Sequence, residues 1–456
     1  MRISRQIHQL LSTMKKLVII LLCLFTGIQI NAQSKKWTLQ ECVRYALENN
    51  ISVRQSALDV ELADIEMSDA NGNFLPSINA NAGVSERTGL SQNPVTFQPE
   101  TTTILSASGG INFGYTIFDG LRNFRQVQRA KISKLSSEYR LSKMQDDISL
   151  FVANGYLQIL QNKANLEVIR SQNDVTKAQI DRTNDLVDAG VLPRGDLLEI
   201  QATNASEMQR IAVAENAVQI SKISLAQLLL IKDYENFDIA DEDFEVVDEG
   251  ISSKPVSEII ESAKENRSEV KIAEQNVELA KKDLQIIKGA YLPTLTAFLG
   301  YSTNYTNKDF LERSFNQQLY ENDGINYGLS LSIPILNGFS VRNNVKRNKI
   351  SLKNNEFLLE QAKLDLESNV YQAYVDAKGA LRAYEAAQAA LESQELAYQY
   401  AKDRYDVGLT NAFDFSQSKL RYDNANIELN RSKYDYIFKL KVLELYFGIP
   451  ATELKF

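Results

Sequence analysis

Hydrophobic and polar positions follow two different periods along this chain, and the switch between them is its main structural signal. Between residues 109 and 117 apolar and polar residues alternate, which predicts a strand with one apolar and one polar face. Asp119 and Gly120 then end the strand. From Leu121 to Val187 there is no proline and only one glycine, which predicts one helix of about 100 Å at 1.5 Å per residue.

The same switch of period occurs a second time, which indicates a duplicated unit. Residues 325–335 alternate again, and a second long helical run follows at 339–405. Residue pairs at a constant offset of 217 or 218 positions are Leu75 and Leu292, Gly120 and Gly338, Asp188 and Asp406, and Asp196 and Asp414. The offset predicts repeat 1 at about 38–231, an acidic connector at 232–254 and repeat 2 at about 255–449.

Shorter elements surround these strands and long helices. Thr38 followed by Glu41 is a capping box, so a helix is expected to start there. Further helices are expected at 52–71, 196–230, 268–289 and 412–446, with two short helices stacked end to end beside each long one. Further strands are expected at 77–85 and 294–301, and polar loops without periodicity at 86–108 and 303–324.

The N-terminal segment has the layout of a secretory signal peptide. Lys15 and Lys16 precede an apolar run from Leu17 to Phe25, which is too short to span a bilayer. Cleavage is expected after Ala32, so the prediction is a signal peptide at 1–32 and a mature chain at 33–456. Met1 and Met14 both remain possible start sites.

Composition narrows the chemistry of the exported chain. Export removes four cations and no acids, so the net charge moves from −8 to −12, which argues against nucleic-acid binding. The only histidine, His8, is also removed, and Cys42 is the one cysteine left. These losses exclude an intrachain disulfide, histidine-based catalysis and the usual zinc ligand sets, so no metal or cofactor is expected. An enzyme that uses only carboxylate side chains for catalysis remains possible.

Four two-faced strands cannot form a complete membrane structure within one chain. Single-chain barrels need at least about eight strands, and an open edge in lipid leaves backbone groups unsatisfied. Several chains must therefore share one barrel, and the strand count alone allows two chains or three. The apolar residues expected to face lipid are Ile111, Phe113, Ile117, Leu329, Leu331 and Ile333.

The export signal, the duplicated strand–strand–long-helix unit, the Leu-Pro pair before each first strand and the glycine tip turns resemble the TolC-like outer-membrane efflux proteins. The resemblance covers residues 38–449. It implies a mainly α fold with a membrane β-barrel: a homotrimer with a twelve-stranded barrel in the outer membrane of a diderm bacterium and a twelve-helix periplasmic α-barrel. It also implies an exit duct for efflux or type I secretion that meets a periplasmic adaptor and an inner-membrane pump and catalyses no reaction.

The resemblance also implies a gate at the tips of the helical hairpins. Asp414 falls on the first of two positions where the family carries an aspartate ring, and Gln417 falls on the second. Tyr405 and Asp196 match a hydrogen bond that holds the family's entrance shut, whereas Thr410 replaces the arginine that usually helps. The residues that resemble adaptor-docking turns are Gly190, Val191, Leu192, Val407, Gly408 and Leu409.

Simpler interpretations stay open beside the duct. Asp196 and Asp414 begin return helices, where acids favour the helix dipole, and apolar tip residues can pack within their own tips. The chain as a whole could be a periplasmic coiled-coil scaffold or adaptor without a pore, or a carboxylate-only hydrolase. The alternating strands favour the duct, because a scaffold has no use for lipid-compatible faces. The residues specify neither the cargo nor the pump class (RND, ABC or MFS).

Overall fold

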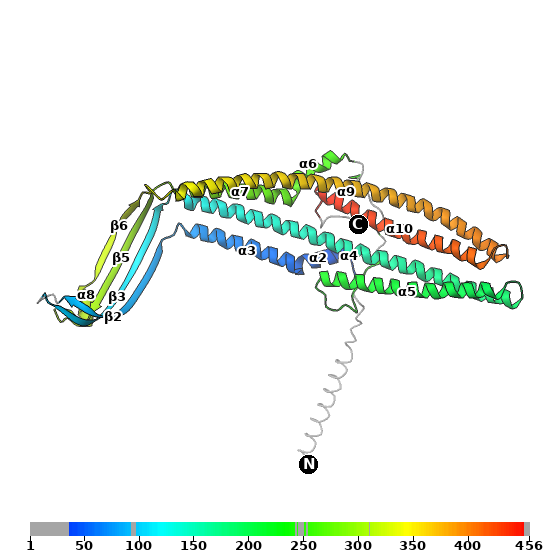
Figure 1. The fold of residues 1–456 in the computed structure, drawn as a ribbon, viewed down its shortest axis with the longest axis horizontal. Coiled ribbons are helices and arrows are strands. Elements are labelled where there is room, and N and C mark those ends of the chain that lie inside the picture. Colours follow the sequence, from blue (N-terminus) through cyan, green and yellow to red (C-terminus); the bar gives the residue numbers. More distant parts are fainter. Residues whose placement is uncertain are drawn as a thin grey trace, which may run out of the picture.

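The computed structural model describes residues 36–92, 97–241, 244, 250–251, 254–309 and 311–450. The predicted signal peptide and both start sites lie outside these residues. The described part is an elongated array of helices with a four-stranded sheet at one end (Figure 1). Among its helices, none is long and apolar enough to cross a membrane.

The longer helices and the four sheet strands come in the same order in both halves of the described chain, and the second half has one extra short helix between its strands. The helices are α2 (Leu39–Asn49), α3 (Ile51–Gly72), α4 (Arg122–Asp188), α5 (Arg194–Leu228), α6 (Val256–Asn266), α7 (Ser268–Gly289), α8 (Phe315–Glu321), α9 (Ser340–Asp406) and α10 (Ala412–Phe447). The strands are β1 (Lys36–Trp37), β2 (Ser77–Gln92), β3 (Pro99–Phe118), β4 (Asp238–Ile239), β5 (Thr294–Thr306) and β6 (Gly324–Ser332).

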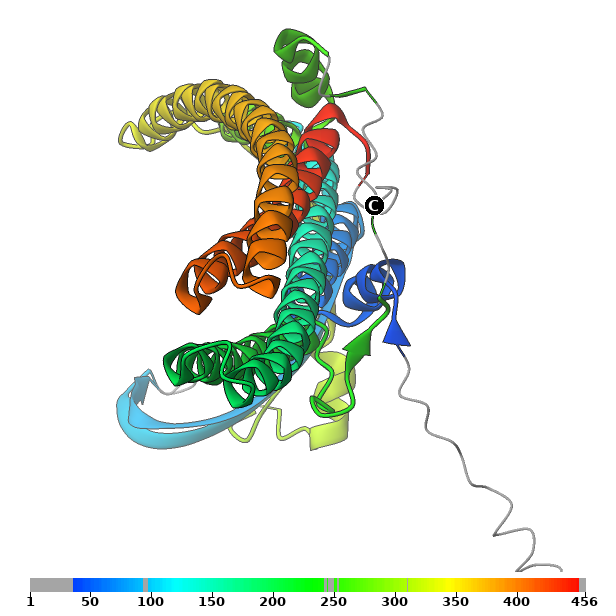
Figure 2. The same cartoon turned by 90° about the vertical axis from the view of Figure 1, so that its right-hand side faces the viewer.

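The two long helices organise the molecule. α4 and α9 each contain 67 residues. The shorter helices α3 and α5 lie in line beside α4, and α7 and α10 lie beside α9, as the helix lengths predicted (Figure 1). Seen from the hairpin end, the helices form an arc, with α2 and α6 on its convex side (Figure 2). Figure 2 shows no such short helix of the described chain on the concave side of the arc.

The four-stranded sheet has the order β2-β3-β5-β6 and is antiparallel throughout. Its register aligns the apolar residues of neighbouring strands. Ile111 lies opposite Ala80 on one side and Tyr301 on the other, so these side chains share a face. On the other face the Asn112 amide donates to the Asn81 Oδ1 at 3.0 Å. One face is therefore apolar and the other polar, and β2 and β6 are the two edges.

The strands differ in length from the prediction. The loop expected at 86–108 is wrong, because β2 continues to Gln92 and β3 begins at Pro99. Polar residues predominate on both faces of this outer ribbon and its few apolar residues do not alternate regularly, so hydrophobic periodicity could not detect it. The loop expected at 303–324 is also partly wrong, because β5 reaches Thr306 and α8 follows. β6 ends at Ser332, which leaves Ile333 outside the strand.

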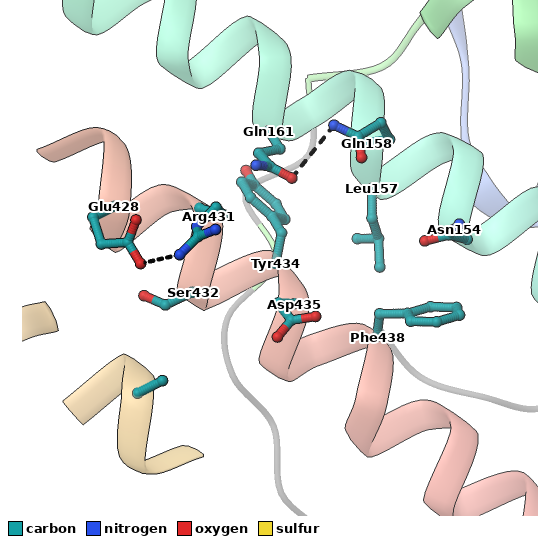
Figure 3. A pocket seen from close by; sticks show the side chains of 11 residues that line it. Asn154, Leu157, Gln158, Gln161, Glu428, Arg431, Ser432, Tyr434, Asp435 and Phe438 are labelled. Carbon is teal, nitrogen blue, oxygen red and sulfur yellow. Dashed lines mark hydrogen bonds and ion pairs between the residues drawn. The ribbon is translucent and has the colours of Figure 1, made fainter. Parts of the chain in front are cut away.

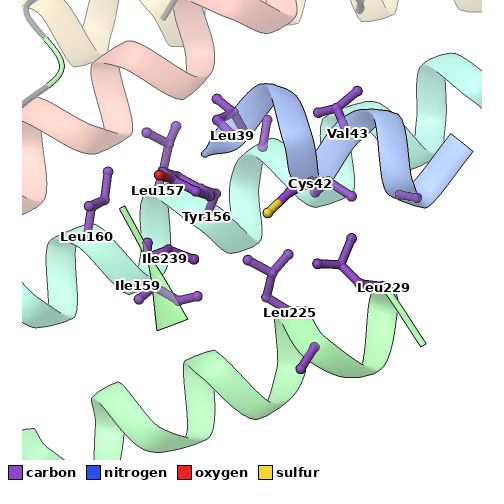
Figure 4. Packing of buried hydrophobic residues seen from close by; sticks show 14 of the residues in the cluster. Leu39, Cys42, Val43, Tyr156, Leu157, Ile159, Leu160, Leu225, Leu229 and Ile239 are labelled. Atoms are coloured by element: carbon purple, nitrogen blue, oxygen red, sulfur yellow. The ribbon is translucent and has the colours of Figure 1, made fainter. Parts of the chain in front are cut away.

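The main hydrophobic core lies midway along the rod, where α2, α4, α5 and β4 meet (Figure 4). The predicted capping box starts α2: the Thr38 hydroxyl accepts from the Glu41 amide at 3.2 Å, and Glu41 accepts in return from the Thr38 amide. Cys42 packs fully buried in this core, as a small apolar residue. The Tyr156 hydroxyl donates to the Ala240 carbonyl at 2.9 Å, which anchors the start of the connector to α4.

The acidic connector is only partly within the described residues. In the part that is described, β4 pairs with β1 in parallel. Asp238 bonds Lys163 at 2.8 Å and Lys222 at 2.9 Å, so this acid is tied to the helices α4 and α5. Burial raises its pKa, but the two lysine hydrogen bonds outweigh burial and lower the pKa of Asp238 below its ordinary value.

Candidate functional site

Both helical hairpins turn through the same backbone motif. At the end of α4 the Gly190 amide donates to the Val187 carbonyl, and at the end of α9 the Gly408 amide donates to the Tyr405 carbonyl. Both glycines have φ of +75°, the left-handed conformation that ends a helix in a Schellman motif. The sequence predicted both turns, because only glycine adopts this conformation freely.

Tyr405 lies in a buried cluster between the two hairpins. Its side chain is 1% exposed and its ring stacks on Phe415, with ring centroids 5.0 Å apart. Its hydroxyl shares a hydrogen bond of 3.1 Å with the Thr183 hydroxyl of α4, so α9 is linked to hairpin α4–α5. Burial raises the pKa of Tyr405, and the Asp196 carboxylate adds to the rise, so the hydroxyl stays neutral at physiological pH.

The structure places Asp196 near Tyr405 but gives the tyrosine a different partner. Asp196 lies in the first turn of α5, and within the described chain its carboxylate makes no hydrogen bond to Tyr405. Neither Asp196 nor Asp414 is the cap itself, because Pro193 and Asn411 occupy those positions. Each acid lies three residues after its cap, where its negative charge still interacts favourably with the helix dipole.

Asp414 and Gln417, the two candidate ring residues, are both exposed on α10. The Asn411 side chain caps α10 by accepting from the Asp414 amide at 2.9 Å. The Asp414 carboxylate accepts from the Thr410 hydroxyl at 3.3 Å. Thr410, which stands where the family usually has arginine, therefore orients this carboxylate, and among the described residues it makes no side-chain hydrogen bond to the other hairpin.

A second link between the hairpins was missed by the sequence reasoning. Arg182 of α4 forms an ion pair of 3.2 Å with the Asp406 carboxylate of α9, and it also donates to the Asp406 carbonyl at 3.3 Å. Asp406 is the repeat of Asp188, but the repeat of Arg182 is Tyr400. The duplication therefore carried no signal for this pair.

Further from the tips, a buried charge cluster joins three helices. The Lys419 ammonium of α10 lies 2.6 Å from Glu207 of α5 and 3.4 Å from Asp423. Thr176 and Asn173 of α4 both donate to the Glu207 carboxylate. Burial raises the pKa of Asp423, although Lys419 opposes the rise. Because these side chains are at least 95% buried, the cluster fixes how α10 sits against α4 and α5.

Several cavities of the described chain are lined by α10, and two of them also involve α4 or α5. One, of about 300 Å³, lies against the charge cluster between α5 and α10 and includes Gln417 in its lining. The other, of about 400 Å³, lies between α4 and α10 and combines amide side chains with Tyr434 and Phe438 (Figure 3). Within the described residues, no three His, Cys, Asp or Glu side chains group to hold a metal ion.

The apolar residues of the tips divide into two kinds. Val191, Val407 and Leu409 are 63%, 69% and 70% exposed, so they offer apolar surface at the end of the rod. Leu192 instead packs against the buried cluster around Tyr405. Leu192 therefore packs within its own tip, whereas the other three side chains keep an exposed apolar surface.

Known proteins resemble the chain along most of its length. A family model described as outer membrane efflux protein matches residues 42–229 and 259–448. The outer membrane protein TolC of Vibrio cholerae is 25% identical over 422 residues, covering 89% of each chain. That of Escherichia coli is 22% identical over 442 residues, covering 93% of this chain and 84% of the relative. The crystal structure of the Campylobacter jejuni CmeC outer membrane channel shares the fold, with a TM-score of 0.77, 18% identity and coverage of 90% and 85%.

Proposed function

The chain belongs to the outer membrane efflux protein family, and we propose that it forms the outer-membrane exit duct of a tripartite efflux or type I secretion system. The observation that carries the proposal is a four-stranded sheet with one apolar face and two open edges, joined to helices of 67 residues. Three copies would supply twelve strands and pair every edge. The helices, at about 1.5 Å per residue, would extend about 100 Å into the periplasm.

The duct would work passively and catalyse no reaction. Its partners would be a periplasmic adaptor and an inner-membrane pump that deliver cargo to the hairpin end. The exposed apolar side chains of Val191, Val407 and Leu409 support adaptor docking at this end, with Gly190 and Gly408 shaping the two turns. A scaffold without a pore is disfavoured, because it would leave the apolar sheet face without an environment.

We predict that the purified chain is a trimer that conducts ions. In mild detergent one species near three times the chain mass should dominate, because each sheet has two edges to pair. Planar bilayers containing this species should show discrete conductance steps. Light scattering for the mass and single-channel recording for the conductance provide the test. A stable monomer with an intact sheet, or a trimer that never conducts, would contradict the duct.

The entrance of the duct would be held shut by the links between hairpins. We infer that Tyr405 with Thr183 and Arg182 with Asp406 form this latch, with Asp196 acting on Tyr405 through its charge. Asp414 and Gln417 would line the entrance, where three carboxylates would attract cations and repel one another. One neutral hydrogen bond contributes about 1 kcal/mol, so three copies can bias the closed state and still be reversed by a docked partner.

We predict that Tyr405→Phe combined with Thr183→Val raises open-channel conductance. Both changes remove a hydroxyl with little change of volume, so packing of the cluster is kept while about 1 kcal/mol per copy is lost. Single-channel recording in planar bilayers measures the effect.

Tyr398→Phe is the matched control for the latch. Burial raises the pKa of Tyr398 to about 12, and its ring stacks on Tyr422 with the planes 5° apart, but its hydroxyl does not link the hairpins in the described chain. Conductance should stay at the wild-type value in this variant. If the Tyr405→Phe/Thr183→Val variant also conducts at the wild-type value, the hydroxyl pair is not part of the latch.

A further inference from the structure

Because the chain is a duplication, contacts between its two repeats indicate how one copy should meet the next. Inside the chain, α4 of repeat 1 packs against α7 of repeat 2. The corresponding helices are α9 in repeat 2 and α3 in repeat 1. α7 lies between α4 and α9, whereas α3 contacts α4 but not α9 within the described residues. One face of α9 and one face of α3 therefore lack the helix that their counterparts possess.

A charge pair marks the contact inside the chain. The Arg129 guanidinium of α4 lies 2.6 Å from the Asp283 carboxylate of α7. Offsets of 218 and 217 residues place Arg347 of α9 and Glu66 of α3 at the equivalent positions, so the same charges recur. Both side chains are exposed, and within the described chain neither forms an ion pair. The hydrogen bond given for the Arg347 side chain in the described chain goes to Asn344 of its own helix.

An aromatic contact recurs in the same way. Lys271 of α7 lies over the Tyr139 ring of α4, at 5.6 Å from the centroid. The equivalent residues are Arg54 of α3 and Phe357 of α9, again a cation and an aromatic ring. The Phe357 side chain is 56% exposed, and Lys353 of its own helix lies over the ring at 4.7 Å. The cation from α3 would take the other face of the ring.

A pair of glycines at the junction of the sheet and the helices is a third feature of the contact between repeats that recurs at the equivalent positions. Gly120 meets Gly289 so closely that an added Cβ would lie 2.3 Å from the Gly289 carbonyl oxygen. The equivalents are Gly338 and Gly72. In the described chain, no atom from another segment lies within 4 Å of the Cβ position of either glycine. Two glycines are thus placed for a close backbone contact that one chain does not make.

The edges of the sheet agree with this pairing. Inside the chain β3 pairs with β5, with Phe113 opposite Leu299. The same offsets place Leu331 of β6 opposite Ala82 of β2, and these residues belong to the apolar face. The exposed apolar side chains beside this seam are Leu58, Leu62 and Ile65 on α3 and Ile350 on α9.

We propose that α9 and β6 of one copy bind α3 and β2 of a second copy, with Arg347 on Glu66, Phe357 under Arg54 and Gly338 against Gly72. The occupant of this surface is a second copy of the chain, because its charges, ring and glycines match those of the contact between repeats. The proposal rests on the proposed function, since only an assembly that closes the sheet needs the seam. Beyond the proposed duct, the seam specifies which residues of neighbouring copies meet and in which register.

Thiol cross-linking in outer membranes tests the seam. A chain with both Glu66→Cys and Arg347→Cys should form covalent species of two and three chain masses with a short bifunctional maleimide, because each cysteine faces the neighbouring copy. The reagent is needed because an ion pair of two long side chains separates the Cα atoms by more than a direct disulfide spans. The native Cys42 is buried, so its background is low. Asp64→Cys with Arg347→Cys is the control, because Asp64 faces Lys134 of its own chain at 2.6 Å and should give no interchain product.

A charge exchange provides the second measurement. Glu66→Arg and Arg347→Glu alone should each lower the fraction of trimer in detergent, and the two together should restore it. If the wild type is a conducting trimer but the 66–347 cross-link does not form and the exchange does not rescue, the seam is wrong and the duct stands. If the wild type is monomeric, the duct and the seam fail together.

Discussion

Replacing Gly120 by alanine should destabilise the chain by about 2–5 kcal/mol. Gly120 has φ of +75°, and a left-handed residue with a Cβ costs about 1–2 kcal/mol. The new methyl would also lie 2.3 Å from the Gly289 carbonyl oxygen and 3.1 Å from the Leu292 Cβ. Backbone atoms cannot rotate away, so the junction must shift, and overpacking of this kind costs about 1–3 kcal/mol. Thermal unfolding followed by circular dichroism measures the loss.

Gly190→Ala is the matched control for this prediction. Gly190 has the same φ of +75°, but in the described chain no neighbouring atom lies within 4 Å of its Cβ position. Replacing it by alanine should therefore cost only the backbone strain, about 1–2 kcal/mol. If the two variants unfolded alike, the contact between Gly120 and Gly289 would not be the cause.

The sequence predicted the framework of this fold because the framework depends on local signals. Helix ends at glycine turns, the proline before each first strand and long stretches without helix breakers are all visible in one dimension. The capping box at Thr38 and the tip turns at Gly190 and Gly408 formed as predicted. The alternating segment around Ile111 lies in a sheet whose register puts its apolar residues on one face.

Features that depend on two distant segments were predicted less well. The ribbon formed by the outer ends of β2 and β3 has no hydrophobic period, since its few apolar residues do not alternate regularly with the polar ones. Tyr405 lies in the cluster between the hairpins, but its partner Thr183 has no sequence signal, because nothing distinguishes this threonine from others on a long helix. The same holds for Lys419 and Glu207, whose 212-residue separation hides the pair. Asp196, Asp414 and Gln417 keep their proposed roles as predictions.

Arginine substitutions on the two faces of the sheet, one in each of two variants, can decide which face contacts lipid. Leu329 lies on the apolar face opposite Ala297, with a side chain that is 68% exposed in the single chain. Ser330 is the next residue, so its side chain points to the polar face, where it lies opposite Thr296. The two positions share depth along the strand and differ only in the face they occupy.

We expect Leu329→Arg to abolish assembly in the outer membrane and Ser330→Arg to be tolerated. An arginine facing lipid near the bilayer midplane costs about 2–4 kcal/mol per chain, whereas one in the polar lumen keeps its water. Because every copy carries the change, the cost is repeated in each chain of the duct. Outer-membrane yield after a salt wash and the heat resistance of the oligomer measure both variants. If Ser330→Arg failed while Leu329→Arg assembled, the polar face would be the lipid face, and the duct would lose its lumen.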